Sequence, residues 1–466
     1  MSPPITLDIA PFLSEKSQLW KACGIRGLFP LEHIPGMISL LAGRPNTSTF
    51  PFDSITMKLK PTLAGMPAAS GDEDPFTISL EEDELNEALQ CVPPLPTRLM
   101  RAEQWLEKFQ SHVHKRVPDA SWDVTVGSGS QDLMYKACEA LISDGDHILL
   151  ETPVSLHSAS WYKTPGTLGF LAALPGTLVE VRADSEGLNP ANLETILLNW
   201  ETTHPGKPYP KLLYTIPSGS NPTGASIPEH RKIEVLKLAK KYNFLILEDD
   251  AYAFVYYGPE GQQARSYFAL ELEVNGEMGR VVRFDSFSKV LSSGMRLGYM
   301  TASPRLSTVV SMITSNTNLQ PSSLAQVMAY ALLSRWGPEG FLAHCAGVAA
   351  FYRARRDVFE RVARKHLSGL AEWTSPIAGM FLYIKLLVHP DGRDADSEEI
   401  VRVKAVSKGV LAVPGTAFMP LGGATPFLRV SFSLIEEDKA DEACRRLREA
   451  ILEARAEAVA AASKNA

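Results

Sequence analysis

The 466-residue sequence has little of what stabilises secreted proteins, spans membranes or binds nucleic acids. Its five cysteines are odd in number and show neither C-x-x-C spacing nor neighbouring histidine pairs, which argues against a disulfide framework and a structural zinc site. No segment reaches the roughly 18 to 20 consecutive apolar residues of a membrane span. The net charge is −7 and there is no basic block, so we expect no nucleic-acid partner.

These absences favour an intracellular protein with reduced cysteines, and we expect a cytoplasmic location. The N-terminal segment MSPPITLDIAPFLSEKSQLWK contains acids and no arginine, unlike a secretory signal or an Arg-rich transit peptide. The length predicts two or three domains, each large enough to bury its own core.

From about residue 120, short apolar segments alternate with longer helical patterns. This alternation predicts an α/β fold whose large domain contains a mostly parallel, seven-stranded sheet. Helices are expected over 131–142, 190–200 and 228–241, the last with Pro228 at its first position. The strands are expected at 123–127, 147–151, 177–181, 211–216, 244–248, 280–284 and 297–301.

A smaller α/β unit is predicted in the C-terminal part of the chain. The pattern becomes mainly helical after residue 303, and the segments 380–386 and 427–432 have the composition of strands. We therefore expect an N-terminal arm over 1–50 that packs with the small domain, a large domain over 51–340 and a small domain over 341–466.

The segment DSFSKVLSSGMRLGY, residues 285–299, combines a lysine with side chains suited to a phosphate. Lys289 is an amine nucleophile, and Ser286, Ser288 and Arg296 offer hydroxyl groups and a guanidinium. Pyridoxal phosphate needs this combination, with the lysine as its Schiff-base partner. A solvated loop lysine among turn-forming serines is the alternative.

Two further segments place polar side chains at the carboxyl ends of predicted strands, where open α/β sheets bind ligands. PSGSNPTG brings Asn221 to a turn, from which its amide can donate to a phenolate-like oxygen. EDDAY brings Asp249 and Tyr252, and a carboxylate there would keep a pyridine nitrogen protonated. A plain turn and solvated acids are the simpler alternatives.

A Gly/Ser loop and an arginine complete the set of candidate site residues. The loop VGSGSQD joins a predicted strand to a helix, so its backbone N–H groups point at any ligand there, and Gly129, Ser130 and Gln131 form a candidate phosphate cradle. Such loops also serve simply as helix caps. Arg429 suits a substrate carboxylate, with a structural ion pair as the alternative.

Taken in order, SGSQ, SNPTG, EDDAY, SFSKxxSSGxRxG and LRVSFS resemble the fold-type I pyridoxal-phosphate aminotransferases, in the kynurenine/2-aminoadipate and fungal aromatic aminotransferase branch. The likeness spans nearly the whole chain and includes GMISLLAGRPN, AGMFLYIK and GVLAVPGTAF. It implies pyridoxal 5′-phosphate as cofactor and a homodimer with shared active sites.

The resemblance also implies a role for each matched residue. Lys289 would bind the cofactor and move the proton between the substrate Cα and the cofactor C4′. Asp249 would pair with the pyridine nitrogen, while Asn221 and Tyr252 would contact the ring oxygen. The cofactor phosphate would be held by Gly129, Ser130, Gln131, Ser286, Ser288 and Arg296.

The implied reaction moves an amino group from an aromatic amino acid, kynurenine or 2-aminoadipate to 2-oxoglutarate. Arg429 would bind the α-carboxylate together with Asn221, and Gly43 and Arg26 of the arm would cover the substrate. Arg26 or Arg44 is a candidate partner for the second carboxylate of the dicarboxylic substrates; either is equally well a surface charge.

Two segments depart from the family pattern close to the expected site. An insertion at 155–165 puts Ser155 where relatives have the aromatic residue that stacks on the cofactor, with Trp161 or Tyr162 as its replacement. Cys91, in an altered proline-rich loop at 91–101, stands where the family has a tyrosine that reaches the neighbouring subunit's phosphate. A lyase or decarboxylase of the same fold, or a non-catalytic relative, therefore stays open as an alternative.

Overall fold

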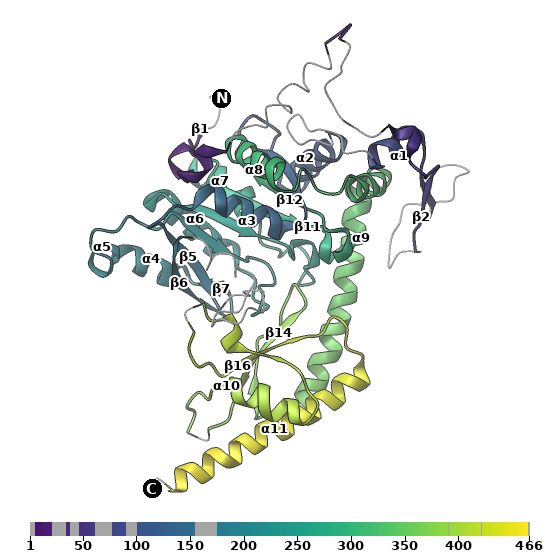
Figure 1. Cartoon of the computed structure of the whole chain (residues 1–466). Helices are drawn as coiled ribbons and strands as arrows, with labels where there is room; N and C mark the ends of the chain where they lie inside the picture. The colour runs from purple at the N-terminus through teal and green to yellow at the C-terminus, as the bar shows by residue number, and fades with distance from the viewer. Residues whose placement is uncertain are drawn as a thin grey trace.

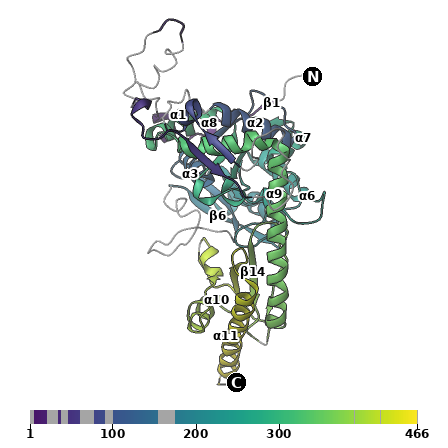
Figure 2. The same ribbon diagram turned by 90° about the vertical axis from the view of Figure 1, so that its right-hand side faces the viewer.

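The computed structural model describes residues 5–20, 34–37, 46–60, 77–89, 100–153, 175–389, 391–420 and 422–464. Two α/β units lie one above the other, and the long helix α9 (Ser323–Leu367) runs beside both (Figures 1 and 2). This helix is kinked at Gly337, which has a φ of 64° and precedes Pro338. The domain limits given above remain a prediction. No helix among these residues is long and apolar enough to cross a membrane.

The large unit is built on one sheet, and all seven predicted strands belong to it. Among the described residues, a two-residue strand at the edge makes the total eight rather than seven, because the chain turns back at Gly187 after β6 (Thr177–Asp184). In spatial order the strands are β4 (Asp123–Gly127), β12 (Gly298–Ala302), β11 (Val281–Ser286), β9 (Leu245–Asp249), β8 (Leu212–Thr215), β5 (His147–Thr152), β6 (Thr177–Asp184) and β7 (Gly187–Leu188).

The strands of this sheet are mostly parallel. β11, β9, β8, β5 and β6 pair in parallel, whereas β12 is antiparallel to both of its neighbours. Every residue of β5, β8, β9 and β11 is buried, which explains their nearly uninterrupted apolar sequences. Since parallel strands end at the same edge, the segments that follow β8, β9 and β11 lie close together.

Helices cover both faces of the large sheet. Leu149 of β5 belongs to one core cluster, with α2, α6 and α7, while its neighbours Ile148 and Leu150 belong to another, with α3 and α8. The predicted helix 190–200 ends at Leu198, because the chain leaves helical geometry at Asn199. Pro228 caps its helix rather than opening it. The helices are α2 (Met100–His114), α3 (Ser130–Leu141), α4 (Pro190–Leu198), α5 (Trp200–Thr203), α6 (Glu229–Tyr242), α7 (Tyr267–Asn275) and α8 (Pro304–Thr317).

The small unit has an antiparallel sheet that contains the two predicted strands, β14 (Phe381–Leu386) and β16 (Phe427–Ser431). Its order is β13-β14-β16-β15, with β13 at Ala371–Glu372 and β15 at Val413–Pro414. The helix α10 (Ser397–Glu399) continues into a π-helical turn, and α11 (Glu437–Lys464) packs along α9 (Figure 1).

The described start of the N-terminal arm packs on the large unit. The expected contact of the arm with the small domain remains a prediction, because much of the arm lies outside the described residues. The strand β1 (Ile5–Thr6) pairs in parallel with β10 (Glu277–Met278). Ile9 and Phe12 are buried in the core cluster that also contains residues of α3, so they anchor this segment to the large unit. Further along, β2 (Ile55–Lys58) and β3 (Thr77–Leu80) form a hairpin, and α1 (Glu82–Leu89) packs on α9.

Candidate active site

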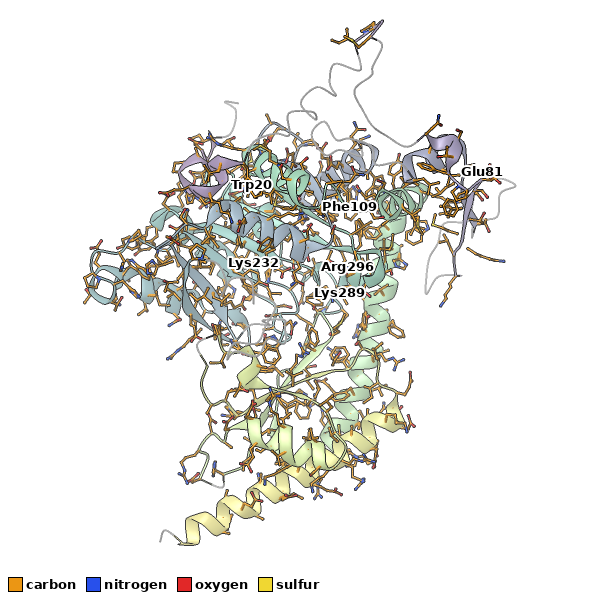
Figure 3. The ribbon with its side chains drawn as sticks, viewed as in Figure 1. Trp20, Glu81, Phe109, Lys232, Lys289 and Arg296 are labelled. Carbon is orange, nitrogen blue, oxygen red and sulfur yellow. The ribbon has the colours of Figure 1, made fainter. Side chains whose placement is uncertain are left out.

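Polar side chains gather at the carboxyl edge of the large sheet, on the side that faces the small unit. Asp249 is the last residue of β9, and Lys289 ends the 3₁₀ turn that follows β11. Asn221 lies in the turn after β8. Lys289 and Arg296 lie near each other at this edge (Figure 3). The parallel arrangement thus brings together residues that are far apart in the sequence.

Asp249 is buried and has one oxygen engaged and one open. Its Oδ2 accepts a hydrogen bond of 2.7 Å from the Tyr214 hydroxyl. Its Oδ1 is also buried and accepts no well-aligned hydrogen bond from a described residue. Burial raises the pKa of Asp249 to about 6, whereas Tyr214, Lys289 and the Ala251 N–H act in the opposite direction. The open oxygen is a site for a donor that no residue in the described ranges supplies in good alignment.

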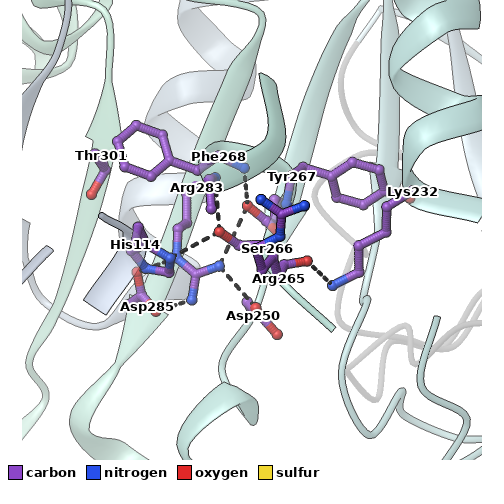
Figure 4. Close-up of polar contacts among 12 residues, drawn as sticks. His114, Lys232, Asp250, Arg265, Ser266, Tyr267, Phe268, Arg283, Asp285 and Thr301 are labelled. Carbon is purple, nitrogen blue, oxygen red and sulfur yellow. Dashed lines mark hydrogen bonds and ion pairs between the residues drawn. The ribbon is translucent and has the colours of Figure 1, made fainter. Parts of the chain in front are cut away.

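The two acids that flank Asp249 have a different function. Glu248 and Asp250 point to the opposite face of the sheet, where Nη1 of Arg283 lies 3.4 Å from Glu248. The same atom lies 2.8 Å from Asp250 (Figure 4). The same guanidinium binds Asp285 at 2.7 Å. Strand alternation therefore singles out Asp249 as the acid of this segment that faces the site.

Lys289 is half-buried, and its ammonium has no described partner of opposite charge in direct contact. The Nζ atom lies 5.4 Å from the ring centroid of Tyr252, and none of the residues placed here accepts a hydrogen bond from it. Burial lowers the pKa of Lys289, Asp249 raises it, and Arg296 lowers it. A lysine in this setting gives up its proton more readily than an exposed one, as a nucleophile or a proton carrier requires.

An open cradle lies at the N-terminus of α3. Gly129 precedes this helix with a φ of 95°, and a Cβ there would come within 2.6 Å of Nη2 of Arg296. Arg296 donates to the carbonyl of Ser128 and to the Ser288 hydroxyl, at 3.4 Å in each case. Helix N–H groups, a guanidinium and hydroxyls at one place suit an anion such as a phosphate.

The other phosphate candidates lie around this cradle. Ser130 is the first residue of α3, and Ser286 accepts a hydrogen bond from the Ser288 N–H at 3.2 Å. Gln131 is exposed on the first turn of the same helix. The structure therefore brings these side chains to the same loop and helix end as Arg296.

Arg429 of β16 reaches from the small unit to the turn after β8. Its Nη1 donates to Oδ1 of Asn221 at 2.8 Å. The guanidinium carbon lies 4.4 Å from the ring centroid of Phe381 and 5.2 Å from that of Phe418. Its Nε is buried and has no partner among the described residues, so one donor of the fork remains open.

The structure assembles most of the predicted site and adds residues that sequence reasoning missed. Tyr214, Phe381 and Phe418 were not expected to contact the site residues. The one available signal for Tyr214 was its hydroxyl, one of two with that of Thr215 at the end of an apolar strand. Several predicted residues lie outside the described parts of the chain, so their placement stays a prediction: Arg26, Gly43, Arg44, Cys91, Ser155, Trp161 and Tyr162.

Comparison with known proteins defines the class to which this fold and site belong. Residues 97–447 match the family model "Aminotransferase class I and II". The fold is shared with the crystal structure of aminotransferase Aro8 from Candida albicans, with a TM-score of 0.82, 26% identity and coverage of 97% of this chain and 100% of that chain. The chain therefore belongs to the class I and II aminotransferases and has the fold-type I architecture.

Two full-length relatives place it within that family. It is 48% identical over 441 residues to "Aminotransferase tdiD" of Emericella nidulans, covering 94% of this chain and 95% of the relative. It is 37% identical over 430 residues to the mouse "Kynurenine/alpha-aminoadipate aminotransferase, mitochondrial", covering 90% and 92%. This chain is an aminotransferase of the branch that contains the kynurenine/aminoadipate and aromatic aminotransferases.

Proposed function

We propose that this aminotransferase moves an amino group from an aromatic amino acid, kynurenine or 2-aminoadipate to 2-oxoglutarate. The observation that carries the proposal is the meeting of Lys289, Asp249 and the Asn221–Arg429 pair at one sheet edge. The donor classes are those in the names of related enzymes, including a Pyrococcus horikoshii kynurenine aminotransferase solved with PMP and kynurenine, 28% identical with a TM-score of 0.68.

Pyridoxal 5′-phosphate is the cofactor of this family, and two features of the site fit it. The buried Oδ1 of Asp249 has no well-aligned donor in the described part of the chain, and a protonated ring nitrogen would supply one. The loop at Gly129 leaves no room for a Cβ, which keeps the guanidinium of Arg296 and the hydroxyl of Ser288 close to the N-terminus of α3. When bound, the cofactor supplies an aldehyde that takes up the amino group and a ring that accepts the electrons released at the substrate α-carbon.

The side chains divide the work by position. Lys289 would bind the cofactor and then carry the proton of the substrate α-carbon, for which its lowered pKa is suited. Arg429 would bind the substrate carboxylate through its open edge, while Asn221, held by Arg429 through Oδ1, would keep its NH₂ for the ring oxygen. Tyr252 would contact the same ring oxygen from beside Lys289.

The remaining assignments concern the phosphate and the substrate cover. Arg296 and the hydroxyls at the cradle would hold the phosphate, together with the N-terminus of α3. Gly43 and Arg26 are proposed to cover the substrate. The phosphate set is Gly129, Ser130, Gln131, Ser286, Ser288 and Arg296.

The test is an amino-donor and oxo-acid panel on protein loaded with pyridoxal phosphate. Lys289→Ala should lower kcat by about 10³-fold or more and abolish the visible absorbance that borohydride removes from the wild type. Lys211→Ala is the matched control, because Lys211 is a partly buried lysine at the opposite edge of the sheet, paired with Asp146. It should leave both properties unchanged.

Each outcome of this panel has a defined meaning. Parallel lines in initial-rate plots and a requirement for an oxo acid would support transfer between two half-reactions. Release of ammonia or carbon dioxide without an oxo acid would overturn the proposal in favour of a lyase or decarboxylase of the same fold. Full activity of Lys289→Ala would show that the nucleophile is assigned wrongly.

We further propose a homodimer in the cytoplasm as the working form. The proposal of a dimer is based on the resemblance to a family whose members share active sites between subunits. Light scattering of the loaded enzyme should give twice the mass of 51.0 kDa, and a monomeric active enzyme would refute this. Microscopy of the tagged chain tests the compartment.

A further inference from the structure

We propose that Tyr214 is a positioning residue for Asp249, whose hydroxyl holds one carboxylate oxygen so that the other faces the cofactor ring nitrogen. The inference rests on the proposed role of Asp249 as the partner of that nitrogen. It adds a residue that would not touch cofactor or substrate. It acts through the geometry and charge of the carboxylate.

The contact between Tyr214 and Asp249 is built into the sheet. Tyr214 lies on β8 opposite Leu247 of β9, so that Asp249 is two residues further along the neighbouring strand. The side chain is fully buried in the core cluster that also contains Phe284 and Leu247. A phenylalanine would fill this space equally well, so what the tyrosine adds is its hydroxyl. That hydroxyl donates to Oδ2 of Asp249 at 2.7 Å.

The direction of this hydrogen bond is fixed. Burial and the negative charges of Asp249 and Glu151 keep the pKa of Tyr214 well above its usual value. The phenol therefore stays protonated wherever the enzyme works, and an ionised carboxylate can only accept. The bond favours the charged form of Asp249 and so opposes the effect of burial on this carboxyl.

The bond also decides which oxygen of Asp249 is available. With Oδ2 engaged, Oδ1 is the buried oxygen that still lacks a well-aligned donor in the described chain. The other groups that influence Asp249 are the like-charged Asp250, Lys289 and the Ala251 N–H, and Asp250 is itself held by Arg283. Without the Tyr214 hydroxyl, the carboxylate would be free to rotate about χ2 and would lose a stabilising donor.

The experiment compares Tyr214→Phe with a matched control, Tyr299→Phe. Tyr299 lies in β12 of the same sheet and is equally buried, but its hydroxyl has no hydrogen-bond partner among the residues described. The first measurement is the Kd for pyridoxal phosphate, obtained by titration of the apoprotein between pH 5 and 8. The second is the denaturant midpoint of each apoprotein, which separates a loss of fold from a loss of positioning.

For Tyr214→Phe we expect a Kd about 10-fold higher and a pH midpoint of binding that moves upward, with a denaturant midpoint close to that of the wild type. Tyr299→Phe should leave the Kd and its pH midpoint unchanged. In the background of Asp249→Asn, the Tyr214→Phe change should have little further effect, because the charge that it supports is gone.

Two results separate failure of this inference from failure of the proposed function. If Asp249→Asn weakens binding but Tyr214→Phe leaves both the Kd and the pH midpoint at wild-type values, Tyr214 has no positioning role. If Asp249→Asn binds the cofactor as tightly as the wild type, the proposed role of Asp249 is wrong, and the inference falls with it. An equal loss in Tyr299→Phe would also overturn the inference, since it would indicate a general effect of removing a buried hydroxyl.

Discussion

The two faces of the sheet at the ends of β9 and β11 carry charges of very different kinds. On one face, Arg283 is bound by Glu248, Asp250 and Asp285, and all four side chains are buried (Figure 4). On the other face, Asp249 has one oxygen without a donor. Lys289 and Arg429, near it, likewise keep donors that no described residue uses.

The difference follows from the two-residue period of a strand. Arg283 pairs with Glu248 and Phe284 with Asp249, so a shift of one residue moves a side chain from the paired cluster to the open site. The paired cluster also binds the helices, because Gln110 of α2 donates to Asp285 and the Tyr267 N–H of α7 donates to Glu248. One face therefore holds strands and helices together, and the other leaves polar groups unsatisfied for ligands.

The largest expected effect comes from breaking the paired face. Arg283→Met would leave three buried carboxylates without their counter-charge, because the side chain of Arg283 is 0% exposed. We expect the free energy of unfolding to fall by about 3–5 kcal/mol. Denaturant unfolding of the apoprotein measures this, and the variant that remains folded should still bind the cofactor.

Arg265→Met is the control for this prediction. Arg265 also binds two carboxylates, Glu229 and Glu273, but its side chain is 47% exposed. Water already screens such pairs, so the unfolding midpoint should change little. Equal losses in the two variants would mean that burial does not distinguish these clusters.

A smaller effect is expected from filling the open face. Gly129→Ala would place a Cβ 2.6 Å from Nη2 of Arg296, at a φ of 95° that side chains rarely adopt. We expect the Kd for pyridoxal phosphate to rise about 10- to 100-fold, since the added atom occupies the cradle and displaces Arg296, at a cost of about 1–3 kcal/mol. Fluorescence titration of the apoprotein measures this change.

The variant Gly276→Ala separates the effect of backbone strain from that of an atom added beside Arg296. Gly276 also has a positive φ, 65°, but a Cβ there would meet nothing within 4 Å. This variant should lose some stability and keep its cofactor affinity. If both variants bind the cofactor with wild-type affinity, the space beside Gly129 is not the phosphate cradle.

Much of this comparison was accessible from the sequence. The strands and the order of Asn221, Asp249 and Lys289 were predictable because buried parallel strands are nearly continuous apolar runs and because polar residues follow their carboxyl ends. The sequence pattern already favours Asp249 among three consecutive acids, and the resemblance implies the same residue. The structure supplies the physical reason, which is the capture of Glu248 and Asp250 by Arg283.

Other features could not be predicted because they depend on contacts between distant segments. Tyr214 reads as one more buried residue until β9 is placed beside β8. Ile9 and Phe12 of the arm pack with α3, a choice that only the assembled core determines. The two-residue strand β7 is too short to leave a periodic pattern.

The smallest expected effect is the pH dependence of the open face. The pKa of Asp249 is raised to about 6 in the cofactor-free protein, and binding of a protonated ring nitrogen favours its ionised form. By linkage, the contribution of Asp249 to affinity is fully present above pH 6 and declines as the pH falls through this value. At pH 6 half of the Asp249 carboxyls are protonated, so affinity should be about twofold lower than at pH 8.

Titration of the apoprotein with pyridoxal phosphate at both pH values measures this change, and Asp249→Asn subtracts the cofactor's own titration. Asp441→Asn is the control at a carboxylate outside both faces, because Asp441 binds Lys365 and His366 on the small unit. It should keep the wild-type pH profile. If the pH dependence of affinity were the same in the wild type and in Asp249→Asn, the Asp249 carboxyl would not be coupled to cofactor binding. The two faces of the sheet would then differ in packing alone.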